Sequence, residues 1–553
     1  MSTRLQGEIF ELFKALSPSD AYLVGFNDYA GKLFIPSTRN IAAARASIKG
    51  LRSRANTVLE RKVLDAMLTK LELNEPQLVM DDILSSIFVH LAKEGIQEKH
   101  LVPLLKCACE AVDATRARFE GTDVPSGVKA LTLYRLDGVI GILDAVKRQT
   151  RSRELRRWCD SLKSKAADFV GLFELDGFGR GEFENVEKVF AKYGFSLGRE
   201  KFYLKALRKG MDYKESPEQL ERNAISWIDE ELPRFREITE RLAKHLGCKP
   251  VPEDVESKIN SRMEIDPSRL VRTTLAIRRV VERFVNEDVN GINPKYRTRV
   301  IETPSFLTGT TPTGAAQFFN TYTARPFQIF FQTTDPTRDP DRSVSALLDL
   351  LVHEEYGHCV HHSNSATGFV RKLSRLELLP TTLLAGPITE GLSFNRELEF
   401  FDASKRLEGK QRLTKVEKNY VRLLESFGGL ELVNMEIEFW TRRWRLVRFL
   451  RVVGDVRVNT GKQSLMAFVD WANEYTGVPR SSVYFQLFPA HEGIFPGYAT
   501  SYAVVGQEIR EIERKIRDDR KRVKFSTYLC SIGFPPRSIY RRMLAEYAAR
   551  LSR

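Results

Sequence analysis

The 553-residue sequence has no uncharged apolar run of roughly 18 residues or more, the length that a membrane-spanning helix needs. Its N-terminus, MSTRLQGEIFELFKALSPSD, mixes charged with apolar residues and has no small-residue cleavage site, so it does not read as a secretory signal. The six cysteines are scattered without a CxxC pair, which suits a reducing compartment better than a disulfide framework. These absences predict a cytoplasmic protein that does not span a membrane.

Motifs of several enzyme classes are also missing. The chain has no GxxxxGK[ST] loop, no GxGxxG following a strand and no GxSxG, so nucleotide-binding and serine-hydrolase functions find no support. Lysine and arginine (86) exceed aspartate and glutamate (72), which gives a formal net charge of +14. The excess is densest from Arg510 to Arg553, but there it follows amphipathic helical patterns without interleaved aromatics. We therefore do not expect a nucleic-acid partner.

Helical periodicity dominates the chain, as in residues 217–246, where apolar residues recur every three or four positions. The composition changes between about 286 and 340, which is rich in Thr, Pro, Gly and aromatics. Within it, RTRVIET (297–303) and PFQIFFQTT (326–334) predict two strands. We predict a mainly α protein with a small β-sheet beside a metal-binding helix and a cleft between two helical lobes. The predicted domains are an N-terminal helical lobe, 1–285, and a catalytic lobe, 286–553.

Four of the eight histidines lie between His353 and His362, in VHEEYGHCVHH. Two imidazoles on one helix with an adjacent glutamate are typical of a zinc site in which the glutamate is the general base. His353 and His358 are five residues apart, about 140° around a straight helix. A one-residue π-type bulge would bring them together, most easily at Gly357. A straight helix would instead place Glu354, His358 and His362 on one face, and the spacing leaves both sets open.

The hexapeptide HEEYGH resembles the HExxGH motif of dipeptidyl peptidase III, a zinc peptidase. More of the chain is similar to an uncharacterised HExxPGH family related to the gluzincin metallopeptidases, although the proline of that motif is missing here. The resemblance implies that His353 and His358 bind Zn²⁺ and that Glu354 is the general base. The similar segments are residues 17–33, 299–319, the histidine-rich helix and 495–515.

A second resemblance follows the histidine cluster. The segment GPITEGLSFNRELEFF, residues 386–401, is similar to the ExxSxxxE pattern of the thimet oligopeptidase and oligopeptidase F families. It implies that Glu390 is the third metal ligand. Glu397 lies two turns further along the same helix face, where the resemblance implies a partner that orients a ligand side chain.

The segment HEGIFPGYATSY, residues 491–502, resembles the His/Tyr-bearing Gly-Tyr loop of the thimet-type peptidases. A phenol or an imidazole there can donate a hydrogen bond to the oxyanion that forms during peptide hydrolysis. The resemblance implies this catalytic role for Tyr498 first, and for Tyr502 and His491 after it.

The predicted strand PFQIFFQTT precedes the histidine cluster, as the edge strand of a gluzincin sheet does. A sheet edge can pair with an extended peptide through main-chain hydrogen bonds. Gln328 and Phe330 are therefore candidate substrate-binding residues. Arg325, Arg338 and Arg342 are candidates to hold a substrate carboxylate nearby.

These patterns predict a zinc-dependent metallopeptidase, of carboxypeptidase or oligopeptidase type, that hydrolyses short peptides. The alternative is a catalytically degenerate helical protein that binds peptides and keeps the metallopeptidase fold. The missing proline and the five-residue histidine spacing keep this alternative open. The oligomeric state is not indicated by the sequence.

Overall fold

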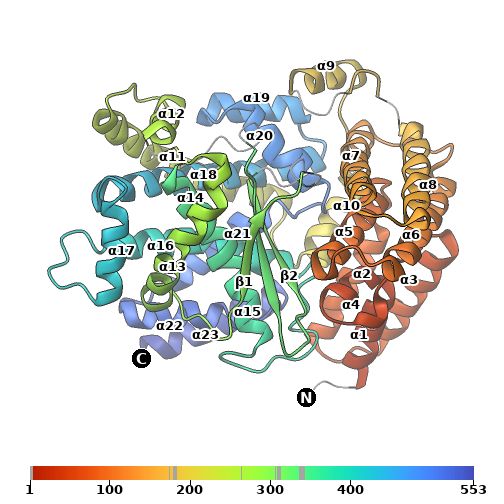
Figure 1. The fold of residues 1–553 in the computed structure, drawn as a ribbon, viewed down its shortest axis with the longest axis horizontal. Coiled ribbons are helices and arrows are strands. Elements are labelled where there is room, and N and C mark those ends of the chain that lie inside the picture. Colours follow the sequence, from red (N-terminus) through yellow and green to blue (C-terminus); the bar gives the residue numbers. More distant parts are fainter. Residues whose placement is uncertain are drawn as a thin grey trace.

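The computed structural model describes residues 4–173, 175–178, 183–262, 264–305, 307, 313–335 and 343–553. Its N-terminal helices gather on one side of the molecule, the helices labelled α12, α13, α16, α17 and α22 lie on the other, and a small sheet stands between them (Figure 1). The prediction of a mainly α protein with a small sheet beside the histidine-rich helix is confirmed.

The described elements, in chain order, fall into three stretches. The first comprises α1 (Arg4–Leu16), α2 (Pro18–Leu23), η1 (Asn27–Tyr29), α3 (Thr38–Ser53), α4 (Val58–Glu72), α5 (Gln77–Glu94), α6 (Glu98–Phe119), α7 (Ser126–Gln149), α8 (Arg153–Val170) and η2 (Gly171–Phe173). The second comprises α9 (Phe183–Tyr193), α10 (Glu200–Lys205), η3 (Ala206–Gly210), α11 (Pro217–Leu246), α12 (Pro252–Arg262), η4 (Pro267–Arg269), α13 (Leu270–Asp288), β1 (Thr298–Glu302), β2 (Gly314–Phe319) and β3 (Phe327–Gln332). The third comprises α14 (Val344–Leu351), η5 (Val352–Cys359), α15 (Val360–Ala366), α16 (Ala385–Lys405), α17 (Lys415–Glu425), α18 (Leu430–Asn459), α19 (Leu465–Thr476), α20 (Arg480–Leu487), η6 (Phe488–Glu492), α21 (Ser501–Glu513), α22 (Asp519–Leu529) and α23 (Arg537–Ser552).

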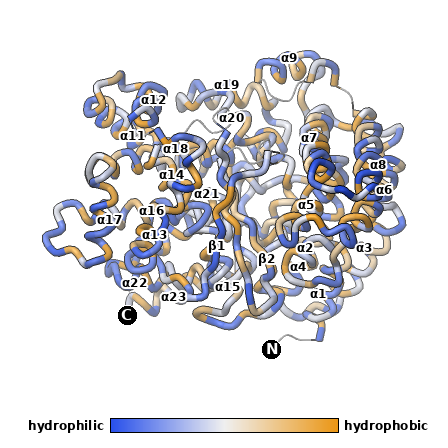
Figure 2. The backbone as a smooth tube through the Cα atoms, in the orientation of Figure 1, coloured by the Kyte–Doolittle hydropathy of each residue, from blue (hydrophilic) through white to orange (hydrophobic). Residues whose placement is uncertain are grey.

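Helix α11 shows how local signals set the boundaries of a helix. Ser216 caps it by accepting a hydrogen bond from the backbone of Gln219, and Pro217 occupies the first helical position, where a missing N–H costs nothing. The helix ends at Gly247, which adopts a left-handed conformation with φ of 67°. Along its length apolar and polar residues alternate in the helical rhythm seen in most helices of the chain (Figure 2). The observed helix spans the predicted range, 217–246.

The sheet has the strand order β1-β3-β2, with β1 parallel and β2 antiparallel to β3. Strands β1 and β3 lie inside the two predicted segments, 297–303 and 326–334. The prediction that the second of these is the edge strand is wrong, because β3 is the middle strand of the described sheet. The edges of the described sheet are β1 and β2. Strand β2, GAAQFF, was not marked as a strand by the sequence because glycine and alanine have low strand propensity.

Helices α11 and α18 pack along each other, and their apolar faces join one core with α5–α8 and α19–α20. A second core lies under α13, the histidine-rich helix, α16 and α21–α23. Since the first core draws residues from both sides of residue 285, the proposed domain boundary there stays a prediction. No helix among the described residues combines the length and apolarity needed to cross a membrane.

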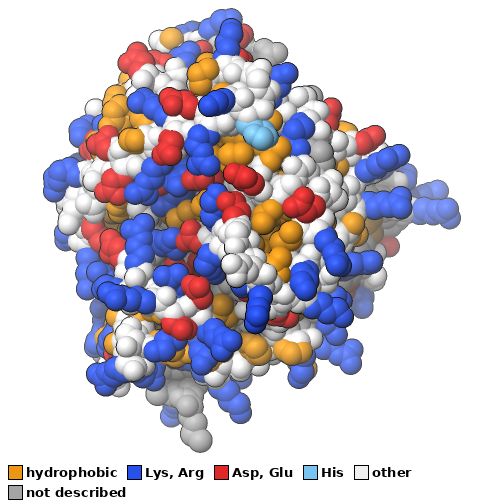
Figure 3. Space-filling view, turned by 90° about the vertical axis from the view of Figure 1, so that its left-hand side faces the viewer, with side chains coloured by type: hydrophobic (Ala, Val, Ile, Leu, Met, Phe, Trp, Pro, Cys, Tyr) orange, Lys and Arg blue, Asp and Glu red, His pale blue; other side chains and the backbone are white. Residues whose placement is uncertain are grey.

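On the face shown in Figure 3, lysine and arginine side chains are scattered among acidic ones and do not gather into one patch. The six cysteines are unpaired.

Candidate metal centre

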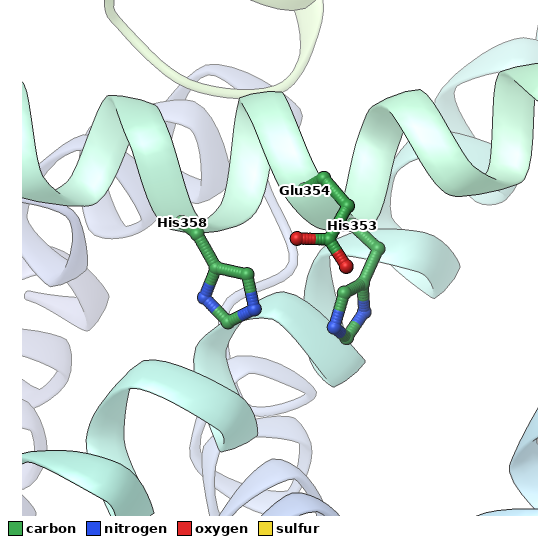
Figure 4. A group of neighbouring side chains, drawn as sticks. All are labelled: His353, Glu354 and His358. Carbon is green, nitrogen blue, oxygen red and sulfur yellow. The ribbon is translucent and has the colours of Figure 1, made fainter. Parts of the chain in front are cut away.

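The histidine-rich helix is distorted at the motif. Helices α14 and α15 are joined through η5, a π-helix spanning Val352–Cys359. The wider turn brings His353 and His358 to the same side of the helix, with Glu354 beside them (Figure 4). Ligand atoms of these three buried residues lie within 4.8 Å of one another, so this cluster could hold a metal ion.

Gly357 makes the distortion compatible with the neighbouring helix. A Cβ at this position would lie 2.2 Å from Oγ and 2.9 Å from Cα of Ser393 on α16. Only a residue without a side chain allows the two helix backbones to approach this closely. The glycine therefore serves the contact with α16 as well as the local helix geometry.

His362 takes no part in this cluster. Its Nδ1 accepts a hydrogen bond from Gln328 Nε2 at 2.8 Å, and its Nε2 lies 2.8 Å from Thr321 Oγ1. Its ring stacks on Phe318 with centroids 4.7 Å apart. Because Gln328 on β3 and Thr321 in the turn between β2 and β3 engage both ring nitrogens, the straight-helix set of Glu354, His358 and His362 is not assembled.

Glu390 on α16 completes a set of three converging ligand atoms. Its Oε2 lies 3.4 Å from His358 Nε2 and 3.9 Å from His353 Nε2. This buried oxygen has no hydrogen-bond partner in the structure. Ligands at about 2.0–2.1 Å from a tetrahedral metal are roughly 3.3 Å apart, close to the observed separations. Burial alone would raise the pKa of Glu390, but the charge of His358 and the hydrogen bond from Tyr498 lower it to about 2.

Two overlapping ligand sets therefore exist, one containing Glu354 and one containing Glu390. Glu390 fits a ligand better, because its Oε2 is unpartnered and faces both histidine Nε2 atoms. Glu354 accepts a hydrogen bond from the backbone of Ala316 instead. Burial, assisted by the charge of Glu390, raises the pKa of Glu354 to about 7, in the range of a general base.

Each histidine is held by a partner on its other nitrogen. His353 Nδ1 lies 2.7 Å from Oε1 of the buried Glu397, whose Oε2 accepts a 2.7 Å hydrogen bond from Arg448. His358 Nδ1 lies 3.0 Å from Ser393 Oγ. The Glu397 carboxylate places the proton of His353 on Nδ1, and the Ser393 hydroxyl can accept a proton from Nδ1 of His358. With these tautomers both Nε2 lone pairs are left for a metal. The structure thus places Glu397 where the sequence predicted an orienting partner.

The donor set of two imidazoles and one carboxylate suits Zn²⁺. Burial and the nearby Arg448 lower the pKa of His353 well below its usual value, which keeps that ring neutral as a ligand must be. Burial opposes protonation of His358 as well, but the charge of Glu390 raises its pKa. A divalent cation between these groups would take the place of the proton on His358, because a metal ligand must be deprotonated.

The tyrosines and His491 lie beside this cluster. Tyr498 donates a short hydrogen bond to Oε1 of Glu390, which leaves Oε2 turned towards the histidines. His491 Nδ1 lies 2.6 Å from the backbone oxygen of Gln486, so this nitrogen carries the proton and Nε2 accepts from the Tyr502 hydroxyl at 3.1 Å. The Tyr502 ring stacks on His353 with centroids 6.2 Å apart. All three predicted residues therefore reach the site.

These groups line a cavity of about 540 Å³, a volume typical of small-ligand sites. Its walls come from β2, α14, η5, residues 380–383, the start of α16, α18 and the segment 486–502. Among the described residues of 1–285, only Lys70 and Leu270 take part. The cavity thus lies mostly inside the second predicted lobe. A larger hollow, about 740 Å³, is lined by Tyr22, Lys93 and Arg325 among others, but no cluster of metal ligands adjoins it within the part of the chain that the structure describes.

The predicted substrate-binding residues do not line the cavity. Gln328 is bound to His362, and Phe330 is buried in the core, both on the middle strand. Arg325 lies at the other hollow. Arg338 and Arg342 lie outside the described residues.

Sequence reasoning missed Ser393, Arg448 and Arg451, which touch or line the site. The serine stood in the ExxSxxxE pattern without an assigned role. The arginines had a signal in RLVRFLRVV, residues 445–453, where arginine recurs every third position in an otherwise apolar stretch. Such a pattern indicates charges buried on one strip of a helix, which need partners.

The fold recurs in solved structures. A candidate lipoprotein of unknown function from Shewanella oneidensis matches with a TM-score of 0.63 and 15% identity, covering 98% of this chain and 100% of that one. A candidate lipoprotein from Colwellia psychrerythraea matches with a TM-score of 0.62 and 14% identity, covering 99% of both chains. A candidate oligoendopeptidase F from Bacillus anthracis str. Ames aligns with a TM-score of 0.35 and 12% identity, over 95% of this chain and 94% of that one.

At such identities the first two structures establish that the fold is shared, but they say nothing about function. The similarity to the third structure is too low to support an argument. No protein-family model matches the chain, and no curated protein does.

Proposed function

We propose that the protein is a zinc-dependent metallopeptidase of gluzincin type that hydrolyses short peptides. One observation carries the proposal: the π-helix turns His353 and His358 towards the unpartnered Oε2 of Glu390. When bound, zinc supplies Lewis acidity, which makes water a nucleophile at neutral pH and polarises the scissile carbonyl.

The chain's own residues divide the remaining work. Glu354, with its pKa near 7, takes a proton from the attacking water and returns it to the leaving amine. Tyr498 orients Glu390, and Tyr502 is oriented by His491. Rotation of either hydroxyl about its C–O bond redirects its proton into the cavity, where it can stabilise the developing oxyanion.

The substrate main chain is expected to pair with the free edge of β2. Thr333 N donates to Thr313 O at 3.0 Å, which sets the alternation of the antiparallel pair. By that alternation Gly314, Ala316 and Phe318 turn their backbone groups away from β3, and all three line the cavity. The Ala316 N–H already donates to Glu354, so the groups left for a peptide are the Ala316 carbonyl and the backbone groups of Gly314 and Phe318. Pairing there would orient a peptide beside Glu354 with little dependence on its side chains.

The test is the metal content of protein purified without chelators, together with peptide cleavage. We expect about one zinc per chain in the wild type and in Glu354→Gln, and none in His353→Ala or Glu390→Ala. Glu354→Gln should retain the metal and lose hydrolysis. His361→Ala is the matched control, because this buried histidine on the same helix bonds the Gly533 carbonyl, outside the site.

Two results would contradict the proposal. Zinc retained by His353→Ala but lost by Glu354→Gln would show that the glutamate, and not the first histidine, is a ligand. A wild type that takes up no zinc, yet binds peptides without cleaving them, would favour the degenerate peptide-binding protein. The cytoplasmic location stays a prediction, testable by cell fractionation.

A further inference from the structure

Arg451 is the exception among the arginines of α18. Its neighbours along the helix pair with carboxylates: Arg445 with Glu231 at 3.1 Å and Arg448 with Glu397 at 2.7 Å. Arg451 makes no ion pair with any residue that the structure describes, and its one hydrogen bond runs from Nη2 to Oε1 of Gln486.

The Arg451 side chain is nevertheless inside the protein. The residue is only 6% exposed, its Nε is buried without a partner, and it lines the cavity of the metal centre. Its guanidinium stacks over the Tyr502 ring, 4.9 Å from the centroid. A buried cation without a counter-charge is costly, and arginine in such places is normally paired. The unused donors therefore indicate a site for an anion that enters the cavity.

We propose that Arg451 binds a carboxylate of the substrate peptide, and that this carboxylate is the C-terminal one. A guanidinium fork matches a carboxylate with two parallel hydrogen bonds, which a lysine could not provide. The inference rests on the proposed peptidase function and narrows it to cleavage near the carboxyl end of the peptide.

The distance between Arg451 and the metal centre limits how many residues can separate the cleaved bond from the C-terminus. Arg451 and His353 both approach the Tyr502 ring: the guanidinium carbon lies 4.9 Å and the His353 ring centroid 6.2 Å from the Tyr502 centroid, so the two groups are at most about 11 Å apart. An extended peptide advances about 3.3–3.6 Å per residue. A carboxylate held by Arg451 therefore belongs to a residue at most about three positions beyond the carbonyl at the metal centre. The expected products are single residues, dipeptides or tripeptides released from the C-terminus.

The test is binding to Glu354→Gln protein, which is not expected to consume the peptide. Three probes are compared by calorimetry: N-acetyl-pentaalanine as the free acid, the same peptide as the C-terminal amide, and an amide with one internal glutamate. We expect the free acid to bind about 10- to 100-fold more tightly than the plain amide, as for a charge-assisted hydrogen bond. Adding Arg451→Gln should bring this ratio to about one without changing the metal content.

Arg457→Gln is the matched control. This arginine lies on the same helix, pairs with Glu221 at 2.6 Å and does not line the cavity, so the ratio should persist. Loss of an unpaired buried cation should leave the thermal midpoint of Arg451→Gln unchanged or higher, which shows that the variant is folded.

The inference would be overturned if Glu354→Gln protein with Arg451 intact bound the free acid and the amide equally well. So would a preference for the internal glutamate alone, which would assign Arg451 to an acidic side chain. A third contrary result is a loss of turnover for Arg451→Gln that is equal for acid and amide, since Arg451 would then act on the oxyanion. If the acid is preferred but no zinc is bound and nothing is cleaved, Arg451 binds the C-terminal carboxylate as inferred, while the proposed function, and with it the position of cleavage, fails.

Discussion

Replacing Glu397 with glutamine should uncouple the stability of the protein from its affinity for metal. Glu397 is buried and holds two partners, His353 through Oε1 and Arg448 through Oε2, each at 2.7 Å. Glutamine has nearly the same shape, but it can accept only one of the two hydrogen bonds and turns an N–H towards the other donor. It also leaves the Arg448 cation without its counter-charge.

The two consequences differ in size and in origin. Breaking one partner of a buried ion pair costs about 3–5 kcal/mol in the free energy of unfolding, because the remaining charge is uncompensated. Loss of the group that orients a metal-binding histidine weakens metal affinity about 10- to 100-fold. The double variant Glu397→Gln/Arg448→Met removes the stranded charge, so most of the stability should return. The metal affinity should stay below that of the wild type, because the neutral amide oxygen of the glutamine is a weaker acceptor for the His353 N–H than the carboxylate that it replaces.

Both quantities can be measured on the same preparations. Urea unfolding followed by tryptophan fluorescence reports stability, and Trp444, whose ring lies 5.7 Å from the Arg448 guanidinium, places a reporter beside the change. Competition with a chelator of known affinity reports zinc binding. The reasoning fails if the single variant binds zinc as well as the wild type, or if the double variant regains zinc affinity together with stability.

Three further substitutions test other parts of the structure. Gly357→Ala forces a Cβ against α16 and should destabilise the protein by about 1–3 kcal/mol, read from the urea midpoint; an unchanged midpoint would show that the close contact does not exist. Tyr498→Phe removes the hydrogen bond that orients Glu390 and should weaken zinc binding about tenfold; lowered turnover with unchanged zinc affinity would instead assign Tyr498 to the oxyanion alone. Burial would raise the pKa of Glu215, but the hydrogen bonds and charge of Arg537 lower it from 4.5 to about 2. This pair therefore contributes stability above pH 4.5 that is lost as the pH falls towards 2, and Glu215→Gln should reduce the acid-induced drop in the urea midpoint; an equal drop in both proteins would exclude the pair as a source.

The site residues that lie close together along the chain could be predicted from the sequence. The two histidines and Glu354 share one short motif, and Glu390 and Glu397 share one helix face, so spacing and resemblance sufficed to nominate them. The structure places all five together. The bulge was one of the two arrangements that the five-residue spacing left open, and the resemblance to the HExxGH motif favoured it.

Contacts between segments that are far apart in the sequence could not be predicted from residue spacing. The sequence of β2 is typical of a turn. It forms a strand because it pairs with β3 through main-chain hydrogen bonds and because Glu354 accepts a hydrogen bond from the backbone of Ala316. Gln328 and Phe330 were placed at an edge because nothing local distinguishes a middle from an outer strand. Arg448 and Arg451 reach the site only because α18 crosses behind it, which depends on how the helices pack.

The site is held by helices packed at backbone distance rather than by loops. Gly357 lets η5 approach α16, and Gly391 does the same between α16 and α21, where a Cβ would lie 2.3 Å from Cγ1 of Val505. Glycine inside a helix weakens it by about 1 kcal/mol relative to alanine, so its presence at both crossings needs a compensating contact. Here the two close helix contacts fix the positions of the site residues. They hold the histidines on η5, Glu390 on α16 and Tyr502 on α21 in place relative to one another. A larger residue at either glycine should therefore impair metal binding even though neither glycine touches the metal.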